Sequence, residues 1–126
     1  MKELSEGINR SIDVLNKTDF ENAVAELNAI LHANHLFVTM SEHGVYITEA
    51  EEKYYVPAHR RTITDVSGAG DTVISVATLC LAAGLNAKTI AEMANLAGGI
   101  VCEEPGVVAI DASRLLAEAK KLNIQC

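Results

Sequence analysis

A glycine-rich stretch at residues 64–73, with the sequence TDVSGAGDTV, leads directly into an almost unbroken apolar helical pattern. A flexible turn that enters a helix leaves backbone N–H groups without partners, and the helix dipole adds about half a positive charge there. Such a start predicts an anion-binding site. Asp71 falls in the first helical turn, where a carboxylate stabilises the helix but competes with a bound phosphate. A phosphate site that keeps a carboxylate beside it suggests phosphoryl transfer with a positioned base.

The composition is that of one folded domain. The 126 residues are enough for a hydrophobic core, and a content of 49% hydrophobic and 21% charged residues excludes a disordered chain. The net charge of -7 argues against nucleic-acid binding, which needs clustered Lys and Arg. The apolar run at residues 73–85 is too short and too interrupted to span a membrane. We therefore expect neither a nucleic acid nor a membrane as partner.

The three cysteines, Cys80, Cys102 and Cys126, form no CxxC or His-rich metal pattern. Cys80 and Cys102 fall within apolar helical patterns, so we expect them to be buried thiols. An odd number of cysteines without a signal peptide favours a cytoplasmic location.

Local signals predict a layered α/β domain. Residues 1–17 are polar and irregular, with room for one helical turn. A capping box at Thr18 and Glu21 starts a helix that ends near residue 34. Strands follow at residues 35–40, 45–48 and 53–58, the first two as a hairpin. After the glycine stretch we expect helices at about residues 72–83 and 87–101, a strand at 107–110 and a last helix; Asn86 and Asp111 cap the later two helices.

Some features allow more than one interpretation. Residues 73–83 are apolar nearly all round, which predicts a helix buried between layers. Gly98-Gly99 inside a helix indicates either close packing or the close approach of a ligand. Asn95 lies off the apolar stripe of that helix. His59-Arg60-Arg61 is either a solvated loop or a basic cluster that attracts a polyphosphate.

Two common nucleotide motifs do not fit the glycine stretch, because no Lys follows Gly70 and the third glycine of GxGxxG is missing. Residues 65–72, DVSGAGDT, instead resemble the C-terminal signature of the ribokinase, or PfkB-type, carbohydrate kinases. Residues 36–44 resemble the strand and V-T-x-G-x-x-G turn of that family, with Ser41 where the family commonly has Gly. Residues 95–101 and 104–107 resemble its late helix and the x-P-G-x loop that follows. Within the family, the sequence is most similar to the heptose-7-phosphate kinase branch, which is sometimes fused to an adenylyltransferase in ADP-heptose synthesis.

The resemblance implies a ribokinase-like layered α/β/α fold and a role for each matching residue. Asp71 would be the catalytic base that accepts the proton of a sugar hydroxyl, although an ordinary helix carboxylate is the alternative. Magnesium would bridge the ATP phosphates. Asp65 would lie near a monovalent-cation site for K⁺, and Glu3 would take the Glu position of an Asn-x-x-Glu motif that organises magnesium. The resemblance also implies an anion hole formed by Gly68, Ala69 and Gly70. It further implies a set of nucleotide contacts, made by Thr39, Ser41, Gly44, Asn95 and Gly98.

The family chains are much longer than this one, and the present sequence starts without a first strand. We therefore expect residues 1–126 to be the C-terminal, nucleotide-binding half of a carbohydrate kinase domain, inactive as an isolated chain. The substrates of the whole enzyme would be ATP and a sugar or sugar phosphate. The alternative is a non-catalytic half-domain that binds nucleotide or only self-associates. In either case we expect exposed apolar surface to be covered by a missing half or in a homo-oligomer.

Overall fold

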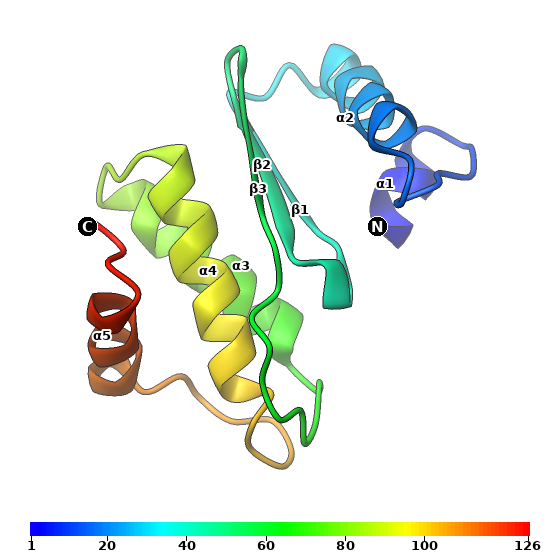
Figure 1. Cartoon of the computed structure of the whole chain (residues 1–126). Helices are drawn as coiled ribbons and strands as arrows, with labels where there is room; N and C mark the ends of the chain where they lie inside the picture. Colours follow the sequence, from blue (N-terminus) through cyan, green and yellow to red (C-terminus); the bar gives the residue numbers. More distant parts are fainter.

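Three antiparallel strands separate two layers of helices in the computed structural model, which describes all 126 residues (Figure 1). The strands β1 (His35–Thr39), β2 (Val45–Glu49) and β3 (Glu52–Val56) pair in chain order. Thr39 pairs with Val45, and Glu49 pairs with Glu52, so both connections are short. A single 3₁₀ turn, η1 (Ser41–His43), joins β1 to β2. The sheet is therefore a simple meander with β2 at its centre.

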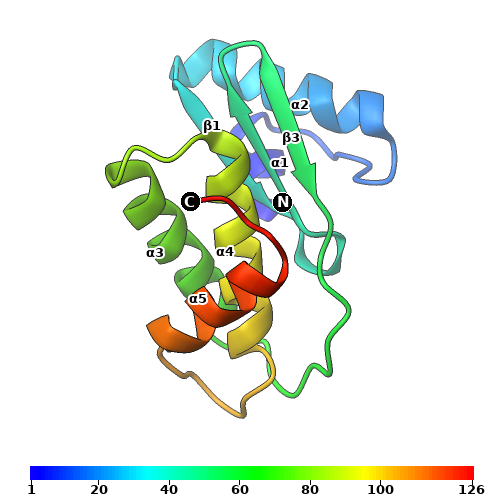
Figure 2. The ribbon, with the colours of Figure 1, turned by 60° about the vertical axis from the view of Figure 1, so that its left-hand side comes forward.

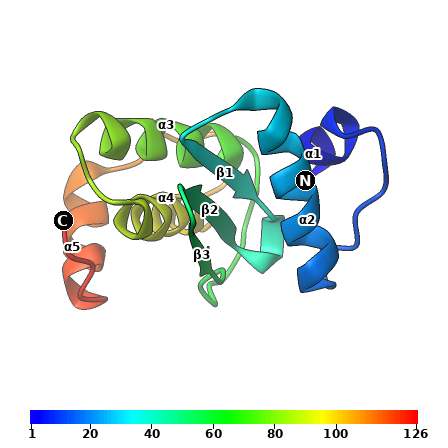
Figure 3. The same cartoon turned by 90° about the horizontal axis from the view of Figure 1, so that it is seen from above.

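Alternation along β2 places its side chains in two separate cores. Val45 and Ile47 face α3 (Ala69–Ala82) and α4 (Ala87–Val101). Tyr46 faces the opposite layer, formed by α1 (Lys2–Gly7) and α2 (Lys17–Leu31). There it meets Phe20 edge to face, with ring centroids 4.9 Å apart. Figure 3 shows the resulting order of layers, with the sheet between the two helix pairs.

The helix α4 is buried along most of its length because it has neighbours on several sides. The sheet and α3 cover it, and α5 (Ala112–Lys121) packs against its outer side (Figure 2). The chain end also returns to α4, where the Thr89 hydroxyl donates to the Gln125 carbonyl at 2.8 Å. This arrangement confirms the predicted layered α/β fold.

Several local predictions are confirmed. The side chain of Asn86 accepts a hydrogen bond from the Thr89 amide at 3.0 Å and caps α4. Asp111 caps α5 in the same way, through the Arg114 amide at 2.7 Å. Cys80 and Cys102 are buried thiols. None of the helices combines the length and apolar composition that a membrane crossing requires.

The predicted start of the first long helix is wrong. The N-cap of α2 is Asn16, whose side chain accepts from the Asp19 amide at 3.1 Å, so Thr18 already lies inside the helix. Glu21 does not complete a capping box, because it reaches across to Lys53 at 3.2 Å. Asn is at least as good a cap as Thr, and position 16 leaves the amide of residue 19 within its reach.

Two further predictions about the second half of the chain are wrong. Residues 107–110 form no strand, because they pair with none of the three strands of the sheet and so lack the hydrogen bonds between strands. The helix α3 is not buried all round, since Ile74 is 53% and Leu79 is 69% exposed. Within this chain α3 packs against α4, and its buried face joins the core that includes Val45 and Ile47 of the sheet.

Candidate functional site

The glycine stretch forms the turn into α3. The structure explains why a glycine is needed at position 68 but not why one stands at position 70. Gly68 is the N-cap with φ +74°, and a Cβ there would lie 2.9 Å from Cγ1 of Val107. Both its backbone angle and its neighbour therefore require glycine. Gly70 is exposed, and a Cβ on it would meet no atom within 4 Å. The packing of this chain therefore does not explain why residue 70 has no side chain.

The start of α3 presents unpaired backbone donors. The amides of Gly68, Gly70 and Asp71 have no acceptor in the chain, whereas the Ala69 amide donates to the Val66 carbonyl at 3.2 Å. Two members of the predicted anion hole are thus free and one is engaged. Sequence reasoning missed the Asp71 amide, although its place in the first turn of a helix is the signal for it. Such a group of free amides can bind an anion.

The carboxylate of Asp71 is exposed and makes no hydrogen bond or ion pair within the chain. Only its backbone carbonyl is used, as acceptor for the Ser75 hydroxyl at 2.7 Å. The side chain therefore stands free beside the unpaired amides and can accept a proton from a bound molecule.

Asp65 has the opposite environment and braces the turn. Its carboxylate accepts hydrogen bonds from the Ser67 amide at 2.9 Å and from the Gly106 amide at 3.0 Å. Hydrogen bonding from Ser67, followed by that from Gly106, holds the pKa of Asp65 below its ordinary value. The amides of Thr64 and Asp65 both donate to the Cys102 carbonyl, at 2.8 and 3.2 Å. The glycine stretch is thereby tied to the end of α4 and to the loop that follows it.

The turn between β1 and β2 lies toward the same end of the molecule as the glycine stretch, the lower end in Figure 1. Thr39 is exposed at the end of β1. Ser41 has φ +50°, the left-handed conformation that favours glycine, which gives a physical reason for the Gly that the family commonly has there. Gly44 has φ +96°, and a Cβ on it would lie 2.1 Å from the Val56 carbonyl oxygen.

Asn95 and Gly98 serve the packing of the chain itself. Asn95 is buried, and its side-chain amide donates to the Pro57 carbonyl at 2.9 Å. A Cβ on Gly98 would lie 2.6 Å from Cγ2 of Val73, so this glycine lets α3 and α4 approach closely. Of the two interpretations of Gly98-Gly99, close packing has a direct structural basis. The hydrogen bond of Asn95 and the close approach at Gly98 do not involve the free amides at the start of α3.

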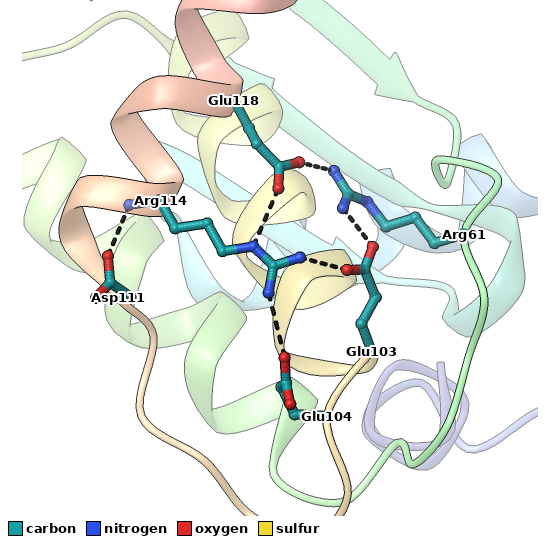
Figure 4. Close-up of polar contacts among 6 residues, drawn as sticks. All are labelled: Arg61, Glu103, Glu104, Asp111, Arg114 and Glu118. Carbon is teal, nitrogen blue, oxygen red and sulfur yellow. Dashed lines mark hydrogen bonds and ion pairs between the residues drawn. The ribbon is translucent and has the colours of Figure 1, made fainter.

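The basic cluster divides into one free and one engaged arginine. Arg60 is exposed and makes no ion pair. Arg61 donates to Glu103 at 2.6 Å and also binds Glu118 (Figure 4). Sequence reasoning missed this arrangement, because the two glutamates lie 42 and 57 residues away along the chain.

Glu3 is linked through the amino group of Met1 to the end of β1 and makes no ion pair or hydrogen bond with Asp71. The amino group of Met1 is 3.6 Å from the Glu3 carboxylate and donates to the Thr39 carbonyl at 3.2 Å. The Glu3 side chain is otherwise exposed. The structure thus places Glu3 close to a predicted nucleotide contact, without a hydrogen bond to the glycine stretch.

No three His, Cys, Asp or Glu side chains gather into a metal-binding group. Asp71 is the acidic side chain at the glycine stretch whose oxygens have no partner, and one free carboxylate suits a Mg²⁺ ion held chiefly by substrate phosphates. Both oxygens of Asp65 already accept hydrogen bonds from amides, so a cation there would share them.

A cavity lies elsewhere, on the face of the sheet covered by α2. It has a volume of about 340 Å³ and is lined mainly by apolar side chains, among them Phe20, Met40 and Tyr46. Burial raises the pKa of Tyr46 to about 12. No residue of the glycine stretch lines this cavity.

Residues 2–113 match the family described as pfkB family carbohydrate kinase. The chain belongs to the pfkB family of carbohydrate kinases. This membership confirms the resemblance identified from the glycine stretch and its flanking segments.

The chain is also similar to curated proteins named Bifunctional protein HldE. That of Desulfatibacillum aliphaticivorans is 40% identical over 108 residues, covering 85% of this chain and 22% of the relative. That of Stutzerimonas stutzeri strain A1501 is 44% identical over 92 residues, covering 72% of this chain and 20% of the relative. The chain therefore spans about a fifth of the length of these relatives.

Solved structures show that the fold is ribokinase-like. Phosphofructokinase-2 from Escherichia coli, in complex with potassium, superposes with a TM-score of 0.87 at 21% identity. The match covers 98% of this chain and 39% of that one. Ribokinase from Arabidopsis thaliana, complexed with ribose and ATP, gives a TM-score of 0.81 at 18% identity over 92% of this chain and 38% of that one.

Proposed function

We propose that residues 1–126 are the C-terminal, nucleotide-binding portion of a kinase that transfers a phosphoryl group from ATP to a sugar or sugar phosphate. The proposal rests on the groups that lie free at the start of α3. The amides of Gly68, Gly70 and Asp71 and the Asp71 carboxylate share one turn, and the fold uses none of them. Donors and a base without a structural partner are available to a ligand.

The free amides would bind the phosphoryl oxygens and stabilise the charge that develops on them during transfer. Asp71 would accept the proton of the attacking sugar hydroxyl, a role that typically contributes about 10²–10⁴ in rate. The bare Cα of Gly70 would leave room for the phosphate to approach the backbone. Magnesium, when bound with ATP, supplies positive charge to the phosphates, and Asp71 is the carboxylate here that could contact it.

For the whole protein, we propose a heptose 7-phosphate as the acceptor sugar. The support is the similarity of about 40% identity to the proteins named HldE, together with the resemblance of the glycine stretch to the heptose-7-phosphate kinase branch. Because the chain spans about a fifth of those relatives, we expect it to bind ATP but not to transfer phosphate alone. The alternative of a non-catalytic nucleotide-binding half-domain makes the same prediction for the isolated chain but not for the longer protein.

The two roles at the start of α3 can be separated by two substitutions. In Gly70→Ala, the new methyl group meets no protein atom, so the free energy of unfolding should stay the same or rise by up to about 1 kcal/mol. The affinity for magnesium and ATP, measured by calorimetric titration of the chain, should fall about tenfold, a loss of roughly 1.4 kcal/mol. Ala82→Ser, at the exposed far end of α3, serves as the control and should leave the affinity unchanged.

Asp71→Asn tests the base in the longer protein. Turnover should fall by about 10²–10⁴, whereas the affinity for ATP should change little, because the amides that bind the phosphates remain. Near-normal turnover in Asp71→Asn would remove Asp71 from the mechanism. If the unmodified chain released ADP on addition of sugar, the expectation that it is inactive alone would be wrong.

A further inference from the structure

Two arginines and two glutamates form a closed ring of ion pairs (Figure 4). We call it the Arg–Glu ring; its members are Arg61, Glu103, Arg114 and Glu118. Each glutamate uses one oxygen for Arg61 and the other for Arg114. Arg61 donates to Glu103 at 2.6 Å, and Arg114 donates to Glu118 at 3.1 Å. The ring itself is electrically neutral, and Arg114 also donates to the Glu104 carboxylate outside it at 3.4 Å.

The ring joins three segments that are distant in the sequence. Arg61 lies on the linker between β3 and α3, Glu103 follows α4, and Arg114 and Glu118 lie on α5. Among residues 59–64, Arg61 alone makes side-chain hydrogen bonds. The ring therefore provides the only side-chain hydrogen bonds of this part of the linker, four residues before Asp65 and ten before Asp71.

Packing holds Arg61 in one place. Its side chain is only 12% exposed, although it belongs to a linker without regular structure. A Cβ on Gly99 would lie 3.0 Å from both Cδ and Nε of Arg61, so the bare backbone of α4 makes room for the arginine stem. Nε is buried without a partner, and the side chain is held by its terminal nitrogens.

A second set of bonds continues from the ring toward the site. The Thr64 and Asp65 amides bind the Cys102 carbonyl, and the Asp65 carboxylate binds the Gly106 amide. The linker and the loop after α4 thus run together from the ring to the glycine stretch. A shift of the linker by one residue would break two ion pairs at the ring and three hydrogen bonds beyond it.

We propose that the Arg–Glu ring positions the glycine stretch, with Arg61 as a positioning residue for the phosphate-binding amides at the start of α3. Because each carboxylate is shared by both arginines, the ring holds the linker, the loop after α4 and α5 in one register. That register places the Asp65 carboxylate at the Gly106 amide and sets the orientation of the first turn of α3. The functional consequence rests on the proposed nucleotide site, whereas the positioning itself does not.

Hydrogen exchange of single amides, followed by NMR in the full 126-residue chain, tests the positioning directly. In Arg61→Met the amides of Thr64, Asp65, Ser67 and Gly106 should exchange at least about tenfold faster, because the bonds that protect them depend on the register of the linker. Buried amides in the middle of α4 should change much less. Arg60→Met, the exposed neighbour, is the control and should exchange like the unmodified chain. Arg61→Lys should restore only part of the protection, because a lysine cannot make the forked bonds.

The proposal is overturned if those four amides exchange at the original rate in Arg61→Met, or if they accelerate only as much as the core of α4. If Arg61→Met does not fold, Arg114→Met tests the proposal in its place. This substitution opens the ring from α5 and leaves the sequence of the linker unchanged. It should accelerate the same four amides.

Calorimetric titration with magnesium and ATP tests the functional consequence. Arg61→Met should bind about tenfold more weakly than the unmodified chain. Equal affinity would overturn the link between the ring and the site. If the unmodified chain binds no ATP, the proposed nucleotide site fails, while the exchange measurement still decides whether the ring positions the stretch.

Discussion

At the scale of single residues, two aspartates six positions apart in the glycine stretch have opposite environments. Asp65 accepts two backbone hydrogen bonds, and its lowered pKa follows from them. Asp71 has no partner in the chain. A carboxylate whose hydrogen bonds are already satisfied stabilises a loop, whereas a free one beside unpaired amides is available for chemistry. The contrast assigns a structural role to the first and leaves the second for a ligand.

The carboxylates of the Arg–Glu ring make the stability of the chain sensitive to acid. Hydrogen bonds from Arg61 are the largest cause that lowers the pKa of Glu103 and of Glu118 below the ordinary value of 4.5. A group whose pKa is lowered in the folded state binds protons more readily when the chain is unfolded. Its contribution to the free energy of unfolding is therefore present above the ordinary pKa and is lost as the pH falls below that value.

Glu118→Gln should therefore lower the free energy of unfolding by about 1–2 kcal/mol near neutral pH, where the two arginines lose a charged partner. The difference from the unmodified chain should shrink at about pH 3.5, below the ordinary pKa of 4.5, because the unfolded chain then binds a proton at this residue. Urea unfolding at the two pH values measures this. Glu51→Gln, at an exposed residue without an ion pair, is the control. A difference that stays constant with pH would contradict the assignment.

At the scale of elements, α3 and α4 approach each other so closely that one added methyl group would disturb their contact. Gly98 faces Val73 across this contact. Because α3 carries the candidate site at its first turn, the distance between these helices also sets where that turn lies. The exposed outer face of α3 contributes nothing to this placement.

Gly98→Ala should lower the free energy of unfolding by about 1–3 kcal/mol, since its methyl group would overlap Val73. In the double variant with Val73→Ala, the loss should be smaller than the sum of the two single losses, because the second change removes the overlap. Thermal or urea unfolding of the three variants provides the cycle. Gly70→Ala, with no neighbour, is the matched control and should not destabilise. Strict additivity would show that the close approach has no energetic cost.

At the scale of the whole molecule, one side of the layered fold is left open. β1 is an edge strand, and its sequence HLFVT carries neither Lys nor Pro, the residues that commonly protect edges. Beside it, Ile74 and Leu81 of α3 are 53% and 46% exposed. Together with His35 and Phe37 they border a shallow cavity of about 130 Å³. The other edge, β3, carries Glu52 and Lys53.

This open side predicts that the isolated chain associates with a second copy. Sedimentation at micromolar concentration should show a dimer, and Ile74→Lys should shift it toward the monomer, because the change places a charge on the exposed apolar face. Ile30→Lys, which alters an equally exposed residue on α2, should leave the dimer intact. A monomer in the unmodified chain would contradict the prediction.

The sequence by itself determined the features that depend on neighbours a few residues apart. The caps at Asn86 and Asp111, the strands, the long helices and the glycine signature are of this kind, and the signature was enough to identify the family. Even a local signal was ambiguous where two capping residues lay close together, and there the cap was Asn16, not Thr18. Short-range periodicity also predicted that α3 is apolar, but not which of its faces has a partner.

Only the tertiary structure decided the roles that depend on residues far apart in the chain. The bonds of Arg61 to Glu103 and Glu118 join residues 42 and 57 positions apart, and the bond of Gly106 to Asp65 spans 41 positions. No local pattern encodes such pairs, because they form only when the sheet and helices have packed. The same reason accounts for residues 107–110, which have a strand-like composition but pair with none of the strands in the folded chain. It also explains the free Asp71, since the absence of a partner is a property of the folded chain.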